Sequence, residues 1–512
     1  MTTQDLPLQQ DCRRWANRLL ILSALGIAYL TLFPFEIHFS SPHPFHGSPF
    51  FLGDSAKTLR HMDFFLNVLL FVPFGFGISA QVGKRCRPRW AAFMWSLIIG
   101  ACTTYLVELL QLYVPGRDSG WEDTISNTAG SVVGFILFAL LGSVILRALS
   151  QAADFLNSWM TPRRLAVLLA LYFVAWAVPT WLLQLRTRLS NWDPTCQLVL
   201  GNDAEEANPW NGQVARVEIW SRALPEQSIR SLHEPASVNL PTDGLQAAYD
   251  FDSAAPFQDQ RGQLPPLVWS HSQPGTESGA AVQLSPAAWL HTVAPVAGLA
   301  REIQKTNQFT VHMVVTPAAV DGASGRIFSL SQSLNNINFH MRQDGKNLVL
   351  FLRDPLSETG SMLAWPVRGV FEAGKTRDIV AVYDGSYAFL YVDGTRIPRV
   401  YRLNPGAALA HHFLLIKTAD LGGFVLVFET LVFLPAGILA GWNAANWAAR
   451  KFTAIAVLGF GLLLPAVAFE VLQMMASGRG IWPANIAMSV VFGLAGVLYM
   501  NADGNWCQAQ KK

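Results

Sequence analysis

The chain has 512 residues, of which 51% are hydrophobic and 14% are charged, and its formal net charge is +2. A soluble chain carries about a quarter charged residues, so the composition excludes a wholly soluble protein. Nothing in the charge balance predicts a nucleic-acid partner. The placement of the charges along the chain is more informative than their sum.

Eight runs of the sequence are nearly uncharged, and each is close to the ~20 apolar residues needed to cross a bilayer core. Backbone groups in that core must pair internally, so we expect each run to be a helix. The first run ends in Pro34-Phe35-Glu36 with no small-residue cleavage site, which favours a retained helix over a signal peptide. The runs are residues 19–35, 62–81, 91–113, 126–146, 165–185, 421–441, 453–475 and 482–500.

Basic residues fall in every second loop between these runs. The positive-inside rule therefore predicts that both termini are cytoplasmic and that residues 186–418 lie outside. Cys196 is then the single external cysteine, which excludes an external disulfide within the chain and favours a buried small side chain. The basic groups are Arg13, Arg14 and Arg18; Lys84, Arg85, Arg87 and Arg89; Arg147, Arg163 and Arg164; Arg450 and Lys451; Lys511 and Lys512.

The membrane part contains an internal repeat. Residues 67–134 align without gaps to residues 429–496, an offset of 362, with 11 identities in 68 positions. Arg18 and Pro34 correspond to Arg163 and Pro179 at a smaller offset of 145. The difference between the offsets predicts two four-helix repeats, the second interrupted by an inserted domain. The predicted domains are residues 1–162 (repeat 1), 163–185 with 419–512 (repeat 2), and 186–418 (the insertion).

A set of polar residues falls at the outer ends of three predicted helices in the first repeat. Ionisable residues inside a span are costly, so each is a candidate functional residue. The guanidinium of Arg117 could hold a phosphate, the carboxylates could bind a divalent cation such as Mg²⁺ or Ca²⁺, or two carboxyl groups could act as general acid and base. The candidates are Asp63, Asn67, Glu108, Gln111, Arg117, Asp123 and Asn127, with Glu470, Gln473 and Arg479 as second-repeat counterparts.

Each of these residues also has a structural interpretation. Asp123 could be the N-cap of the fourth helix. Glu108 and Arg117 could form an ion pair that holds a loop. Asn67 and Gln111 could make hydrogen bonds between helices.

The order and spacing of these residues resemble the signature of VanZ-like membrane proteins. The resemblance covers roughly residues 19–146 and implies a bacterial membrane module linked to glycopeptide resistance at the cell envelope, without implying a particular reaction. The second repeat departs from the pattern, with Val425, Glu429 and Ser489 in place of Asp63, Asn67 and Asn127, so we expect any chemistry in the first repeat. The matching segments are Asn67 to Pro73 and Gly75, then Glu108 to Gln111, then Arg117 with Asp123, Asn127 and Gly130.

The inserted region has short alternating runs, such as residues 309–315, 347–352, 378–383 and 387–392, with Asp-Gly turns. This pattern predicts a β-sandwich built of hairpins. The segments around Asp384-Gly385 and Trp210 to Leu224 resemble a laminin-G, or concanavalin-like, domain in circularly permuted order. For Trp210, Trp220 and Trp365, core packing is favoured over sugar stacking.

The sequence thus predicts an all-α membrane part with an inserted all-β domain. The leading function is that of a VanZ-like protein of the bacterial inner membrane that acts at the outer leaflet, on or beside a lipid-linked cell-envelope component. Its expected partners are membrane lipids, a lipid-linked glycan precursor or a partner membrane protein. Two alternatives are a non-catalytic subunit that docks through its β-sandwich, and a lipid or anion transporter. The transporter is disfavoured because the polar residues lie near the outer face rather than at mid-membrane depth.

Overall fold

A computed structural model describes residues 5–32, 60–82, 89–114, 120–233, 241–251, 255–271, 281–356, 363–398, 401–414, 423–442 and 459–509. The chain divides into two compact units. The first comprises Met1–Ala170, Leu434–Gly461 and Gly493–Lys512, and the second comprises Leu171–Phe433 and Leu462–Phe492.

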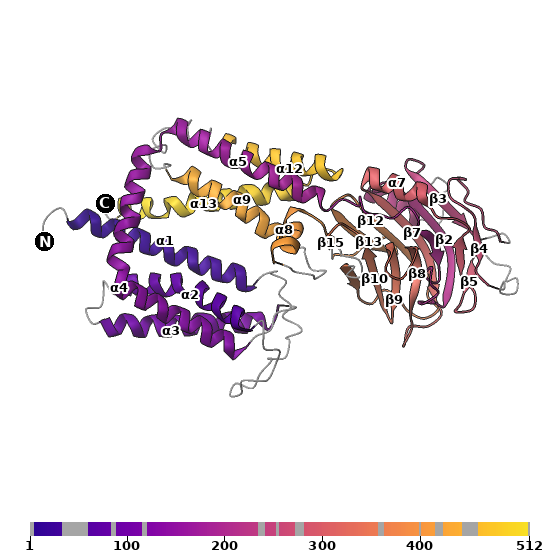
Figure 1. Ribbon diagram of the computed structural model, residues 1–512, viewed down its shortest axis with the longest axis horizontal. Coiled ribbons are helices and arrows are strands. Elements are labelled where there is room, and N and C mark those ends of the chain that lie inside the picture. Colours follow the sequence, from indigo (N-terminus) through magenta and orange to yellow (C-terminus); the bar gives the residue numbers. More distant parts are fainter. Residues whose placement is uncertain are drawn as a thin grey trace. The chain divides into compact units, whose positions relative to one another are not determined.

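Eight helical segments of the described residues are long and apolar enough to cross a membrane, as the sequence predicted. They lie in α1 to α5, α9, the joined η1–α12 segment and α13 (Figure 1). The helices are α1 (Asp5–Leu32), α2 (Arg60–Val82), α3 (Arg89–Gln111), α4 (Trp121–Trp159), α5 (Pro162–Leu185), α6 (Glu226–His233), α7 (Ala297–Thr306), α8 (Pro405–Leu414), α9 (Phe424–Gly441), the π-helix η1 (Gly459–Leu463), α12 (Leu464–Ser477) and α13 (Pro483–Ala509).

Helix α4 is much longer than the predicted span of residues 126–146. Its 39 residues continue past Arg147, which the sequence placed in a loop, to Trp159. The added segment, from Arg147 to Trp159, is rich in Ala, Leu and other good helix formers. The helix ends just before Thr161-Pro162, because a proline disfavours the helical conformation of the residue that precedes it.

Glycines allow α2 and α4 of the first unit to approach each other closely. A Cβ on Gly75 would collide with the carbonyl of Ser131, and one on Gly134 would collide with the carbonyl of Val72. Small residues at helix crossings are the usual way for membrane helices to pack. The same collisions recur in the first unit exactly 362 residues later, for Gly437 against Gly493 and for Gly496 against Leu434.

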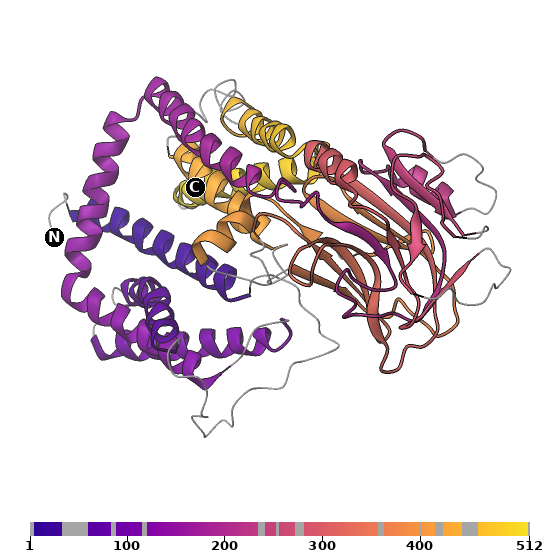
Figure 2. The same ribbon diagram turned by 45° about the vertical axis from the view of Figure 1, so that its right-hand side comes forward.

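The second unit contains two antiparallel sheets that pack face to face (Figure 2). One has the order β11-β10-β9-β8-β1-β6-β4 and the other β14-β13-β12-β7-β2-β3, with β15 beside β13 and β5 beside β2. Phe309 of β7 meets Phe339 of β9 between them, with ring centroids 5.0 Å apart. The strands are β1 (Gln197–Leu200), β2 (Gly212–Trp220), β3 (Leu245–Asp250), β4 (Leu267–Trp269), β5 (Val282–Leu284), β6 (Leu290–Thr292), β7 (Phe309–Pro317), β8 (Ser324–Ser331), β9 (Ile337–Asp344), β10 (Asn347–Leu352), β11 (Leu363–Val367), β12 (Arg377–Tyr383), β13 (Tyr387–Val392), β14 (Thr395–Arg396) and β15 (Tyr401–Arg402).

The four strands expected from period-two alternation are present as β7, β10, β12 and β13. Trp210, Trp220 and Trp365 are all buried, which agrees with core packing and removes them as stacking platforms for a sugar. Cys196 is buried too and has no disulfide partner.

Candidate functional site

The first polar cluster, which we define as Asn67, Glu108, Gln111 and Asp123, is built in the first unit from one end of each helix α2, α3 and α4. Asn67 Nδ2 donates to Asp123 Oδ1 at 2.7 Å and so links α2 to α4. Gln111 Nε2 donates to the carbonyl of Thr31 at 2.9 Å and so links α3 to the end of α1. Asn67 and Gln111 therefore do make the interhelical hydrogen bonds that their positions suggested.

Three of the four cluster residues also line a cavity of about 750 Å³ between the helices. Asn67, Gln111 and Asp123 form its polar end, together with Thr31. The remainder is lined mainly by leucines of α1 and α2, with Ser23, Gly26 and Pro73. This volume lies within the range of about 300–1,000 Å³ that is common for small-molecule sites. An apolar trough with a few convergent polar groups is the expected form of a site for an amphiphile.

Glu108 and Asn127 are both almost fully buried, but neither lines this cavity. Glu108 Oε2 accepts a hydrogen bond from the backbone N–H of Gly120 at 2.9 Å, which ties the end of α3 to the start of α4. Asn127 Nδ2 donates to Thr104 Oγ1 at 2.9 Å. These two residues hold the helices together around the cavity.

One structural interpretation from the sequence is wrong. Asp123 does not cap α4, because the N-cap is Gly120, which makes no side-chain capping bond, and Asp123 lies in the first helical turn. Its carboxylate instead accepts from Asn67. Arg117, the expected anion clamp, lies outside the described residues, as does the side chain of Asp63, whose backbone belongs to α2.

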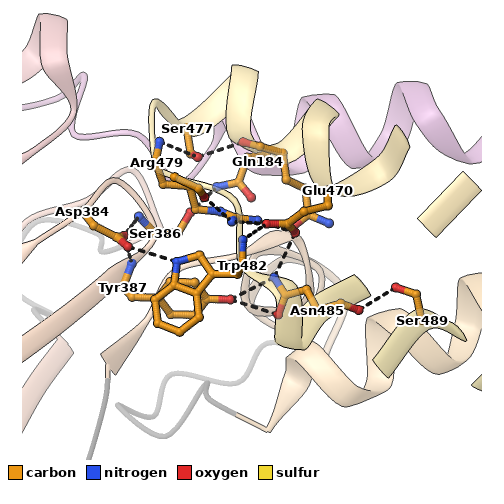
Figure 3. Close-up of polar contacts among 12 residues, drawn as sticks. Gln184, Asp384, Ser386, Tyr387, Glu470, Ser477, Arg479, Trp482, Asn485 and Ser489 are labelled. Atoms are coloured by element: carbon orange, nitrogen blue, oxygen red, sulfur yellow. Dashed lines mark hydrogen bonds and ion pairs between the residues drawn. The ribbon is translucent and has the colours of Figure 1, made fainter. Parts of the chain in front are cut away.

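The second polar cluster, which we define as Glu470, Gln473, Arg479 and Asn485, lies in the second unit. Figure 3 shows three of its members, Glu470, Arg479 and Asn485. Arg479 forms a two-pronged ion pair with Glu470, with Nη2 2.8 Å from Oε2, and its Nη2 also reaches Gln473 Oε1 at 3.3 Å. Asn485 Nδ2 donates to Glu470 Oε2 at 3.1 Å. Burial acts to lower the pKa of Arg479, but the pairing with Glu470 outweighs it and raises that pKa above its ordinary value.

The β-domain covers this second cluster. The hydroxyl of Tyr387, at the start of β13, accepts from Asn485 Nδ2 at 3.2 Å, and its ring lies 4.4 Å from that of Trp482 (Figure 3). Trp482 Nε1 donates to Asp384 Oδ2 at 3.3 Å, and its ring stacks on Phe389. The β12–β13 hairpin thus occupies the place that a ligand of this cluster would need.

A close approach of two backbone segments also fixes the contact between the β12–β13 turn and the end of α12. Gly385, in the β12–β13 turn, has φ +108°, and a Cβ there would lie 2.7 Å from the carbonyl oxygen of Ser477. Asn307 Nδ2 donates to both the Gly385 carbonyl at 3.0 Å and the Ser477 carbonyl at 2.6 Å. Gln308 Nε2 donates to the Gly478 carbonyl at 2.6 Å. The segment that joins α12 to α13 is therefore bound along its length by the β-domain.

One hydrogen bond is common to both clusters. Glu108 accepts from the backbone N–H of Gly120, and Glu470 accepts from the backbone N–H of Trp482 at 2.6 Å. Donor and acceptor are 12 residues apart in each case, and both pairs are related by the offset of 362 found in the sequence.

Sequence reasoning missed a buried charged group in the β-domain. His312 of β7 lies between Glu218 of β2, at 2.7 Å, and Asp378 of β12, at 3.1 Å, and His233 approaches Asp378 at 3.3 Å. Burial acts to lower the pKa of His312, but the bonds to Asp378 and Glu218 outweigh it and raise the pKa to about 9. Period-two alternation places Glu218 on the face of β2 opposite to Val217 and Ile219, which was the available signal.

The described residues contain no group of three or more His, Cys, Asp or Glu side chains arranged to hold a metal ion. The divalent cation considered from the sequence therefore has no ligand set in the described part of the chain.

Residues 20–142 match the family model described as VanZ/LLP1. This segment, which contains the first polar cluster, is VanZ-like, and with the apolar helices it indicates a multi-pass membrane protein. No curated protein and no solved structure matches the chain.

The buried pair in the second cluster leads to a stability prediction. We expect Arg479→Gln to lower the free energy of unfolding by about 3–5 kcal/mol, because Glu470 would remain as an unpaired buried charge. The double variant Glu470→Gln/Arg479→Gln should recover part of that loss. The exposed pair Arg230–Glu226 supplies the control, since Arg230→Gln should cost less than about 1 kcal/mol. Thermal unfolding of the purified protein measures all three, and equal midpoints for the two single variants would contradict the prediction.

The His312 group leads to a pH prediction. Its folded pKa of about 9 lies above its ordinary 6.5, so its stabilising contribution is full below pH about 6.5 and is lost as the pH rises through about 9. The pKa of Asp378 is lowered below its ordinary 3.8, since the bonds to His312 outweigh burial, and this contribution holds above that value. The unfolding midpoint of the β-domain should therefore fall between about pH 6 and pH 10. In the His312→Gln variant the decrease of the unfolding midpoint with pH should be much smaller. The same decrease in the variant and the wild type would contradict the attribution of the pH dependence to His312.

Proposed function

We propose that this protein is a VanZ-like protein of the bacterial inner membrane that acts on or beside a lipid-linked component of the cell envelope, and that its first polar cluster binds a membrane lipid at the outer leaflet. The observation that carries the proposal is the contrast between the two clusters. In the first, three polar side chains open into a cavity of about 750 Å³ lined otherwise mainly by leucines. In the second, the ion pair is closed on itself and covered by Tyr387 and Trp482.

We further propose that the membrane part arose by duplication and that the second copy now holds the β-domain. The recurrence of the Gly75 contact at Gly437, and of the Glu108 bond at Glu470, both at the offset of 362, supports the duplication. The inserted domain, with its two antiparallel sheets, is consistent with a laminin-G or concanavalin-like sandwich in permuted order. In this arrangement the second cluster attaches the β-domain to the membrane helices and does not bind a ligand.

The orientation follows from the basic loops, which place the β-domain outside the cytoplasm. The contacts of the β-domain support this orientation, because they are made with the segment between α12 and α13, one of the loops free of basic clusters that the sequence assigns to the outside. By the same rule, the end of α3 and the start of α4, which carry the first polar cluster, are expected at the outer leaflet.

A cavity-filling substitution tests lipid binding. Leu69, on α2, lines the cavity and is 54% exposed, and we expect Leu69→Trp to reduce the lipid that copurifies with the protein about tenfold, because overpacking a filled site costs about 1–3 kcal/mol. Leu25, on α1, is 61% exposed and does not line the cavity, so Leu25→Trp is the matched control. The lipids extracted from protein purified out of bacterial membranes are quantified by mass spectrometry. Equal lipid content in wild type and Leu69→Trp would overturn the proposal.

Labelling of introduced cysteines tests the orientation. Cys196 is buried and unsuitable, whereas Ala319, in the β-domain, and Ser158, near the end of α4, are both exposed. In intact spheroplasts a membrane-impermeant maleimide should modify Ala319→Cys at once and Ser158→Cys only after the membrane is broken. The reverse pattern would invert the topology.

A further inference from the structure

Gln111 lines the cavity, and its side-chain amide carries a buried oxygen without a partner in the described structure. Gln111 is 7% exposed, and its Nε2 donates to the carbonyl oxygen of Thr31. A main-chain carbonyl can only accept, so this bond fixes the orientation of the amide and leaves Oε1 as the other atom. Gln111 Oε1 has no hydrogen-bond partner in the described structure. A buried acceptor in this state destabilises the folded protein, and a ligand with a donor would remove that cost.

Two carboxyl groups lie at this end of the first unit's helices, one of them in the lining of the cavity. The carboxylate of Asp123 lines the same cavity, where it accepts from Asn67. The carboxylate of Glu108 lies near enough for Asp123 to act on it electrostatically. A donor that also carries a positive charge is therefore favoured at this end over a neutral one.

The second cluster shows which group such an amide oxygen takes in this chain. Gln473, the counterpart of Gln111, receives its Oε1 hydrogen bond from the guanidinium of Arg479, a cation with N–H donors, at 3.3 Å. Arg117, the counterpart of Arg479, lies outside the described residues. A cationic N–H donor is thus the chemistry that the matching oxygen accepts.

The rest of the cavity is suited to a hydrocarbon chain. Leu19, Leu22 and Leu30 of α1 and Leu66, Leu69 and Leu70 of α2 line it. From Leu19 to Thr31 the wall extends about 18 Å along α1. Four of the six leucines are more than 40% exposed, so the trough is accessible to a lipid from the side of the helices.

We propose that the cavity binds a phospholipid with a primary ammonium head group, of the phosphatidylethanolamine type. The ammonium donates to Gln111 Oε1 and lies against the carboxylate of Asp123, and an acyl chain lies along the leucines. This inference rests on the proposed function and names the class of lipid.

The contrast between primary and quaternary ammonium makes the proposal testable. A trimethylated ammonium has the same charge but no N–H to donate, and a glycerol head group has hydroxyl donors but no positive charge. The full-length protein is delipidated in detergent and incubated with an equimolar mixture of dioleoyl phosphatidylethanolamine, phosphatidylcholine and phosphatidylglycerol. Bound lipid is then measured by mass spectrometry. We expect phosphatidylethanolamine to be bound over each of the other two by about tenfold, as for one hydrogen bond to a charged group.

Two variants identify the groups responsible. In Gln111→Leu and in Asp123→Asn, the ratio of bound phosphatidylethanolamine to each of the other two lipids should fall towards one. The total amount of bound lipid should stay within about twofold of the wild type, because the leucines that line the cavity are unchanged. Equal binding of the three lipids by the wild type would overturn this inference and leave the proposed function standing. Equal preference for phosphatidylglycerol and phosphatidylethanolamine would overturn the ammonium assignment. If the wild type retains no lipid at all, the proposed function fails with it.

Discussion

A carboxylate near the end of a membrane-spanning helix has to find a partner, because stranding it in hydrocarbon costs about 2.5–3.5 kcal/mol on insertion scales. Glu108 and Glu470 meet this constraint in the same way, by accepting the backbone N–H of the residue 12 positions later. The bond ties the end of one helix to the start of the next. The positions of Asn67 and Gln111 around the cavity, and of Arg479 and Asn485 around their ion pair, depend on the helix ends that this bond fixes.

Around that shared bond the two clusters differ at a few positions that the offset of 362 aligns. Trp482 stands where the first repeat has Gly120, and its indole ring supplies the surface against which Tyr387 and Phe389 pack. Asn485 replaces Asp123 and donates both to Glu470 and to the hydroxyl of Tyr387, which a carboxylate could not do. In the second cluster an aromatic ring and a donor amide thus attach a folded domain, while the cluster keeps a carboxylate bonded in the same way as Glu108.

Much of the fold was predictable from the sequence. The apolar runs predicted seven of the eight spans with bounds close to those of the structure. Period-two alternation with Asp-Gly turns predicted β7, β10, β12 and β13. The extension of α4 was missed, because Arg147 suggested a loop, whereas helix propensity alone carries the chain on to Trp159. In the site, the offset of 362 paired Glu108 with Glu470, and each of these carboxylates accepts from the backbone N–H of the residue 12 positions later. The covering of the second cluster could not be predicted, because it depends on Tyr387 and Asn307, which only the folded β-domain brings to the end of α12.

The two clusters also differ in whether the matching amide oxygen has a partner. In the second cluster the amide oxygen of Gln473 and the side chain of Asn485 have partners within the chain, and of the Arg479 guanidinium only Nε is buried without one. In the first, Gln111 Oε1 is buried without a described partner beside an open cavity. An apolar residue of similar shape would avoid the desolvation cost of such a group, so a group of this kind beside a cavity calls for a reason. A site that meets a ligand donor does have that reason, because the ligand supplies the hydrogen bond when it enters.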